Sequence, residues 1–212
     1  MAHVLLVVFL ITLLYIGIAN RLFTYINILM VQGVLLTGAA YLQLHDMSWN
    51  NLLFVLAETL IFKTLAIPLF MKNIIRKNKI TREAEPFVPN FVSLIIITFL
   101  LAGSFLGAGT IADSDMGHLD AMFFAAAVST VFVGLFIIIS RKKLITHVMG
   151  YLVIENGIFV LSLAVGNEMP MMVNSGILLD IFVSILVLGI FANKIGDVFR
   201  ESDVEQLNHL RD

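Results

Sequence analysis

Long apolar stretches separated by short polar segments run through almost the whole chain. A helix needs about 20 mainly apolar residues to cross the hydrocarbon core of a bilayer, and seven stretches meet this requirement. They are Ala2–Asn20, Phe23–Leu44, Asn51–Met71, Val88–Thr110, Ala121–Ser140, Leu144–Val165 and Met171–Asn193. The first stretch has no basic segment before it and no small-residue cleavage site before Arg21, so we interpret it as a mature helix rather than a signal peptide. We therefore predict an all-α membrane protein with seven transmembrane helices.

The composition excludes a water-soluble fold. Of the 212 residues, 59% are hydrophobic and 13% are charged, against about 25% charged residues in an ordinary soluble domain. The mean hydropathy is +0.99, and a soluble fold of this size cannot bury so much apolar surface. The chain contains no Cys, which excludes a disulfide scaffold and a cysteine-held iron–sulfur or other metal site in this chain.

The basic residues are distributed unevenly between the polar segments. All of them except Lys63 fall on one side of the predicted bundle: Arg21, Lys72, Arg76, Lys77, Lys79, Arg82, Arg141, Lys142, Lys143, Lys194, Arg200 and Arg211. The segments on the other side carry acids only: Asp46, Asp113, Asp115, Asp120 and Glu168. Because cytoplasmic segments of membrane proteins are enriched in Lys and Arg, this distribution predicts an N-terminus outside and a C-terminus in the cytoplasm.

A shift of the chain by 122 residues brings several polar residues into register. Under this shift, Glu58 falls on Asp180 and Lys72 falls on Lys194. We interpret the match as two parallel three-helix repeats joined by a linking helix; the alternative is a chance coincidence among apolar helices. The repeat predicts a first three-helix unit at 1–73, a basic loop with linking helix four at 74–120, a second three-helix unit at 121–195 and a cytoplasmic tail at 196–212.

Four ionisable residues lie inside the predicted spans: Glu58, Lys63, Glu155 and Asp180. They are nine to 14 residues from a basic residue of the cytoplasmic side, which at about 1.5 Å per residue places them near the middle of the bilayer. A charge at this depth costs at least about 2.5–3.5 kcal/mol, so such residues usually face the bundle interior or an ion path. Burial favours the neutral form of an acid and a nearby cation favours the charged form, which suits proton loading and release.

We therefore nominate these four residues for a proton or ion pathway, with a structural ion pair as the alternative. Glu58 and Lys63 are five residues apart, so in an α-helix they do not share a face, and we expect their partners on other helices. Three further residues are candidates for support. Asn156 can hydrogen-bond within the bundle, and Pro68 removes a backbone donor and can kink its helix. His147 lies near the cytoplasmic end, where it is either a relay or an interfacial residue.

The remaining patterns indicate packing and lipid contact. Gly103, Gly107 and Gly109 permit close approach of another helix, and the loop Lys72–Pro86 is suited to anchoring on lipid headgroups. The chain has no phosphate-binding Gly loop, no nucleophile constellation, no metal-ligand spacing and no basic stripe for nucleic acid. The sequence thus predicts no catalytic, cofactor-binding or metal site and no nucleic-acid partner.

Several of these residues also carry a family resemblance. The chain resembles hydrogenase-4 component E. The residues that carry the resemblance are the runs Arg141-Lys142-Lys143, Gly150-Tyr151 and Glu155-Asn156-Gly157, the single residues Asp180 and Lys194, and the segment from Phe62-Lys63 through Ile67-Pro68-Leu69 to Met71. The resemblance covers nearly the whole chain. The part from Ala121 onward is also similar to the K subunit of bacterial complex I and the C subunit of Mrp-type antiporters. Asp180 matches the third-helix acid of the K subunit, whereas Glu155 lies about one turn later than its second-helix acid.

The resemblance implies a non-catalytic, multi-pass subunit of a complex I-like, group 4 hydrogenase-type assembly in the cytoplasmic (inner) membrane of a prokaryote. Its expected partners are antiporter-like and other membrane subunits, a peripheral hydrogenase-like redox arm and the lipid bilayer. Nickel–iron and iron–sulfur centres are expected in partner subunits and no cofactor in this chain. Glu155 and Asp180 would load protons, and Lys63 and Glu58 would extend the relay. The resemblance does not decide between H⁺ and Na⁺ as the transported ion.

Two other functions are compatible with the sequence. One is a purely structural scaffold in the same complex, with its buried acids ion-paired and silent. The other is a stand-alone seven-helix transporter or receptor, which predicts a stable monomer or homodimer. Against this last function, the chain offers almost no extramembrane surface for a ligand and only four intramembrane charges.

Overall fold

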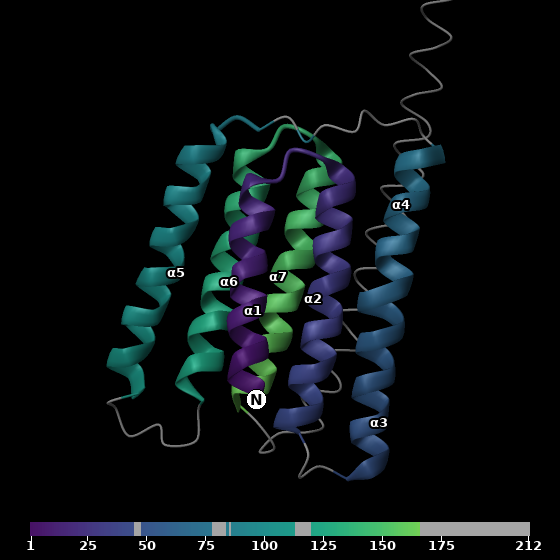
Figure 1. The fold of residues 1–212 in the computed structure, drawn as a ribbon, viewed down its shortest axis with the longest axis vertical. Coiled ribbons are helices and arrows are strands. Elements are labelled where there is room, and N and C mark those ends of the chain that lie inside the picture. Colours follow the sequence, from purple (N-terminus) through teal and green to yellow (C-terminus); the bar gives the residue numbers. More distant parts are fainter. Residues whose placement is uncertain (45–47, 78–83, 85, 113–119, 166–212) are drawn as a thin grey trace, which may run out of the picture.

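The described part of the chain is helical. The computed structural model describes residues 1–44, 48–77, 84, 86–112 and 120–165. Its helices are α1 (Ala2–Ile18), α2 (Leu22–Gln43), α3 (Trp49–Glu58), the π-helix η1 (Thr59–Ala66), α4 (Ile67–Lys77), α5 (Asn90–Ala112), α6 (Ala121–Ser140) and α7 (Leu144–Val165). Figure 1 shows an upright bundle in which α3, η1 and α4 follow one another as a single long rod.

Five helices of the described part are long and apolar enough to cross a membrane. They are Leu22–Gln43, Leu52–Arg76, Asn90–Gly109, Ala121–Ser140 and Ile145–Val165. Helix α1 is apolar too, but its 17 residues lie at the short end of the roughly 17–25 residues that span a bilayer. The predicted seventh span, Met171–Asn193, and Asp180 within it lie outside the described residues. An all-α membrane protein is therefore confirmed, whereas seven spans, their orientation and the two repeats stay predictions.

The third helical rod differs in extent from the sequence prediction. The predicted span was Asn51–Met71, but helical structure begins at Trp49 and continues to Lys77. The boundary expected after residue 73 therefore falls inside α4. The physical reason is that a helix does not end where the bilayer core ends, because polar residues such as Lys72 and Arg76 can extend it into the headgroup layer.

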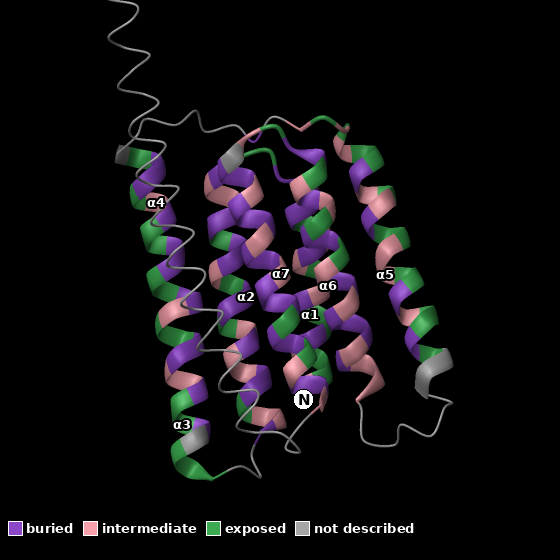
Figure 2. Cartoon of the chain, turned by 180° about the vertical axis from the view of Figure 1, so that it is seen from behind, coloured by how far each residue is buried: buried purple, intermediate pink, exposed green. Residues whose placement is uncertain are grey.

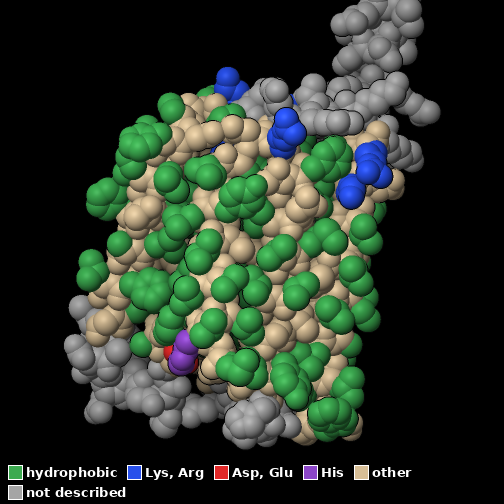
Figure 3. Space-filling model, viewed as in Figure 1, with side chains coloured by type: hydrophobic (Ala, Val, Ile, Leu, Met, Phe, Trp, Pro, Cys, Tyr) green, Lys and Arg blue, Asp and Glu red, His purple; other side chains and the backbone are tan. Residues whose placement is uncertain are grey.

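The two ends of the bundle differ in chemistry. Successive long helices run in opposite directions (Figure 1), so the turns that carry Arg21, Lys72, Arg76, Arg141 and Lys142 meet at one end. We call this the basic end. Figure 3 shows Lys and Arg side chains gathered there and a His with an acid at the other end. That second pair is His3 and Asp120, whose Nε2 and Oδ2 atoms are 3.1 Å apart.

The basic end is tied together by its loops. The N–H of Ala84 donates to the carbonyl of Asn20 at 2.8 Å, and the N–H of Phe87 donates to that of Ser140 at 2.9 Å. Arg141, which is 1% exposed, donates from Nη2 to the carbonyl of Gly17 at 2.7 Å. The chain between α4 and α5 thus connects the α1–α2 turn to the α6–α7 turn.

The burial pattern separates a central group of helices from an outer one. Figure 2 shows buried residues concentrated on α2, α6 and α7, while exposed residues recur along α5. Phe91, Phe99 and Leu106 of α5 are 73–75% exposed. A Cβ atom added at Gly103, Gly107 or Gly109 would meet nothing within 4 Å. No other described helix therefore packs closely against the Cβ side of these three glycines.

Closely packed glycines join the central helices. A Cβ atom at Gly134 of α6 would lie 2.8 Å from the carbonyl oxygen of Gly150 of α7, and one at Gly157 would lie 3.1 Å from that of Ala127. Such close approach is typical of membrane helices, where small residues let backbones come together. Gly33 likewise lets α2 approach η1 closely, because a Cβ atom added at Gly33 would lie 2.5 Å from Thr64 Oγ1 and 3.0 Å from Thr64 Cα.

Replacing Gly33 by Ala is expected to lower the free energy of unfolding by about 1–3 kcal/mol, because an inserted methyl group forces the backbone of η1 away from α2. Thermal unfolding in one detergent, followed by circular dichroism, measures the effect. Gly103→Ala is the matched control, since its methyl group meets nothing within 4 Å. Equal stability of the two variants would contradict the close α2–η1 contact.

Candidate functional site

The π-helix η1 positions Lys63. In η1 the N–H of Ile67 bonds to the carbonyl of Phe62, five residues earlier. Such wide turns are rare and occur frequently at functional sites. Pro68 follows directly and has no N–H, so it cannot close a regular helical hydrogen bond to the preceding turn. The wide turn and the proline together set the position from which Lys63 enters the bundle interior.

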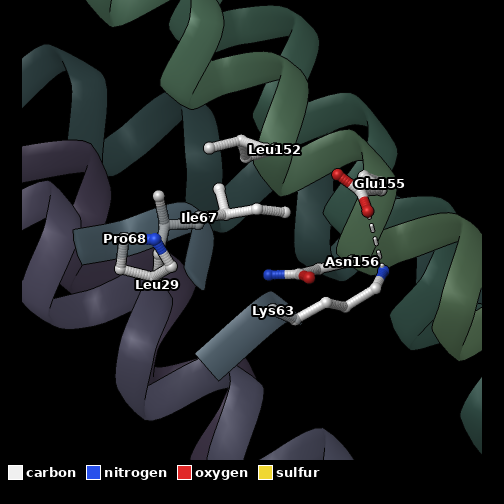
Figure 4. A pocket seen from close by; sticks show the side chains of 7 residues that line it. All are labelled: Leu29, Lys63, Ile67, Pro68, Leu152, Glu155 and Asn156. Carbon is white, nitrogen blue, oxygen red and sulfur yellow. Dashed lines mark ion pairs between the residues drawn. The ribbon is translucent and has the colours of Figure 1, made fainter. Parts of the chain in front are cut away.

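Lys63 forms an ion pair with Glu155 of α7. The distance between Lys63 Nζ and Glu155 Oε1 is 3.3 Å, and the side chains are 5% and 2% exposed. Figure 4 shows the two side chains pointing toward each other from different helices. The Nζ atom also lies 5.0 Å from the ring centroid of Phe159, a cation–π distance. The structure therefore joins two of the nominated residues across the interior of the bundle.

A chain of hydrogen bonds continues from the residue beside Glu155. Asn156 Nδ2 donates to Gln32 Oε1 at 3.0 Å, and Gln32 Nε2 donates to Thr12 Oγ1 at 2.9 Å. Thr12 in turn donates to the carbonyl of Phe9 at 2.6 Å. These bonds link α7, α2 and α1 at the position where α7 meets η1. They fix the turn of α7 that carries Glu155.

Sequence reasoning nominated Asn156 but missed Gln32 and Thr12. Both missed residues are uncharged, so neither stands out in an apolar span as a charged residue does. A usable signal was present, because a buried amide without a partner costs about 1–3 kcal/mol. Gln32, fully buried in an apolar helix, therefore required a polar neighbour from another helix.

Glu58 is also buried, and it directly precedes η1. The expectation that Glu58 and Lys63 lie on different faces assumed α-helical periodicity. That assumption is wrong here, because residues five apart are one hydrogen-bonded turn apart in a π-helix. The third rod thus carries two buried ionisable residues in neighbouring turns. Asp180, the fourth nominated residue, lies outside the described part of the chain.

A small cavity of about 10 Å³ adjoins the ion pair, with room for about one water molecule. Its polar lining consists of Lys63, Glu155 and Asn156, and its apolar lining consists of Leu29, Ile67, Pro68 and Leu152. Among the described residues, no group of three His, Asp or Glu side chains is arranged to hold a metal ion. The polar side of the cavity thus presents one ammonium, one carboxylate and one amide group.

Comparison with known proteins finds distant relatives of this chain. It is 27% identical over 132 residues to the uncharacterised protein Rv0085 of Mycobacterium tuberculosis, a match covering 62% of this chain and 59% of that protein. It is 26% identical over 163 residues to hydrogenase-4 component E of Escherichia coli K12, covering 76% of this chain and 74% of that protein. The same protein of Shigella flexneri gives the same values.

The chain is related to a membrane-subunit family. The match spans about three-fifths of the length of the mycobacterial relative. No family model matches the chain, and no solved structure matches it. Together with the five apolar helices, the similarity identifies a multi-pass membrane protein.

The remaining nominated residues lie in two different places. Pro68 lines the cavity beside the ion pair. His147 lies nearer the basic end, where its Nε2 atom is 2.9 Å from the carbonyl oxygen of Arg141. Eight residues of α7 separate His147 from Glu155, about 12 Å along the helix axis. The structure therefore does not bring His147 to the ion pair.

Proposed function

We propose that this chain is a non-catalytic integral-membrane subunit of a complex I-like, group 4 hydrogenase-type complex in the inner membrane of a prokaryote. In this proposal Glu155, Lys63, Glu58 and Asp180 contribute to a proton (or Na⁺) pathway coupled to redox chemistry in other subunits. The observation that carries the proposal is the buried Lys63–Glu155 pair, which joins η1 to α7 inside an apolar bundle. The similarity to hydrogenase-4 component E over 76% of the chain supports the kind of assembly.

The ion pair suits proton transfer because a proton donor and a proton acceptor lie close together. One proton can move from the Lys63 ammonium to the Glu155 carboxylate, which leaves an amine and a carboxylic acid. The Nζ and Oε1 atoms are 3.3 Å apart, so this transfer needs no large movement of either side chain. Each group can then exchange its proton with a further neighbour. Glu58 in the adjacent turn and Asp180 in the predicted last span are the neighbours we propose.

The partners follow from the same proposal. Antiporter-like and other membrane subunits would continue the pathway, and a peripheral hydrogenase-like arm would hold the nickel–iron and iron–sulfur centres. This chain would hold none of them and would carry out no redox step. His147 would exchange protons with water at the basic end, which we place in the cytoplasm. Asn156 and Pro68 would position the pair.

A purely structural scaffold is the second candidate, and one observation favours it. Lys63 and Glu155 are within ion-pair distance. A permanent ion pair that only holds the third rod against α7 would have the same geometry. Removing one partner of such a tie destabilises a protein whether or not protons move. The two functions therefore separate only in variants that keep the complex assembled.

Co-purification tests the assembly. The tagged chain is extracted from its native membrane in a mild detergent, and the proteins that accompany it are identified by mass spectrometry. We expect large antiporter-like subunits and a peripheral arm with iron–sulfur and nickel–iron-type subunits. Recovery of the chain alone, as a stable monomer or homodimer, would contradict the proposal and favour an independent transporter.

A further inference from the structure

The cavity beside the ion pair is asymmetric. Its polar side chains are those of Lys63, Glu155 and Asn156. Figure 4 shows the apolar side chains gathered to one side of the pair, with the Asn156 amide between. An apolar side of the cavity thus faces a polar end wall.

The direction of this asymmetry follows from the order of residues along each helix. Helices α2 and α7 begin at the basic end, and the third rod runs toward it. Leu152 precedes Glu155 on α7, and Ile67 follows Lys63, so both lie about one turn closer to the basic end than the charges. Leu29 stands in the same relation to Gln32 on α2. All of the apolar lining therefore lies between the ion pair and the basic end.

The polar end wall meets the requirements of a bound water molecule. A cavity of about 10 Å³ is at the lower limit of what holds one water, which needs two to four polar partners. The Glu155 carboxylate, the Asn156 amide and the Lys63 ammonium supply them.

We propose that this cavity binds one water molecule at Glu155, and that Leu29, Ile67 and Leu152 form a narrow apolar entrance to it from the basic end. The inference rests on the proposed function in one respect: a hydronium ion at this site would transfer one proton to the Glu155 carboxylate and remain as water. Access of water to the site is itself independent of whether the complex translocates protons. The access and the translocation can therefore be tested separately.

Cysteine accessibility tests the entrance, because the chain has no Cys of its own. Leu152→Cys, on the basic side of Glu155, is compared with Leu163→Cys, which is also buried on α7 but lies on the other side of Glu155. Leu161→Cys controls for a lipid-facing position of the same helix, and Lys142→Cys identifies vesicles whose basic end faces the medium. The intact complex in sealed membrane vesicles is treated with the small cation Ag⁺. The remaining thiols are alkylated after denaturation and quantified by mass spectrometry.

We expect Leu152→Cys to react with Ag⁺ at least tenfold faster than Leu163→Cys and Leu161→Cys, and only in vesicles in which Lys142→Cys also reacts. Reaction of Leu152→Cys no faster than Leu163→Cys, or only from the opposite side, would overturn the entrance. If Leu152→Cys does not assemble, Ile67→Cys is compared with Val55→Cys, buried on the far side of Lys63 in the same rod, with the same two outcomes. Fast labelling in a complex that proves not to translocate protons would contradict the proposed function and leave the water site standing.

Discussion

Replacing Lys63 by Arg is expected to stop proton translocation while the complex stays assembled. Arg keeps the positive charge that faces Glu155, but a guanidinium group does not give up its proton in proteins. A relay in which Lys63 alternates between ammonium and amine then loses its exchangeable proton. We expect a fall of at least about tenfold in the translocation rate, which corresponds to about 1.4 kcal/mol or more in the barrier.

The rate is measured as acidification of the lumen of inverted membrane vesicles, driven by the electron donor that co-purification identifies. Lys142→Arg at the basic end is the matched control, and we expect it to translocate at the unaltered rate. Glu155→Gln tests the other half of the pair, with the same expected loss. An assembled Lys63→Arg complex that translocates normally would support the structural scaffold and contradict the relay.

Replacing Lys63 by Met is expected to lower the free energy of unfolding by about 3–5 kcal/mol, because Glu155 is left buried without its counter-ion. The double variant Lys63→Met/Glu155→Met is expected to regain most of this loss. Two apolar side chains of similar length then replace the pair, and such replacements are neutral or stabilising by about 1–4 kcal/mol. Denaturation in mixed detergent micelles, followed by circular dichroism, gives the free energies of unfolding of the unaltered protein, the single variant and the double variant.

Lys142→Met provides the reference for removing a lysine from the surface, with an expected change within about 0.5 kcal/mol. A double variant no more stable than the single one would show that the side chains do not act on each other, against their 3.3 Å separation. The double variant also informs on function. If the relay operates, a complex that contains it is stable but does not move protons.

The sequence predicted most accurately those helices whose ends carry strong chemical signals. Ala121–Ser140 and Leu144–Val165 have the predicted bounds. The first begins where the Asp120 carboxylate accepts the N–H groups of Met122 and Phe123 at 3.0 and 3.3 Å, a regular helix cap. The π-helix was not predicted, because its wide turn depends on the packing of Thr64 against Gly33 as well as on Pro68.

The sequence predicted the charged residues of the site but not the contacts between them. Lys63 and Glu155 were found because a charge in an apolar span requires an explanation. Their mutual contact was not found, because it depends on the rotation of two helices that are far apart in sequence. The water-sized cavity was outside the reach of the sequence for the same reason. That Asp180 also lies near the middle of the bilayer stays a prediction, since this residue falls outside the described part of the chain.

The tie between Arg141 and Gly17 also determines when the fold can be completed during synthesis. The two residues are 124 positions apart, and chains elongate at about 5–20 residues per second. Arg141 is therefore synthesised roughly 6 to 25 seconds after Gly17, whose carbonyl accepts its hydrogen bond. Several helices are made in that interval. In the nascent chain the first two helices lie in the membrane without this hydrogen bond, which can form only after α6, the fifth long helix, has emerged.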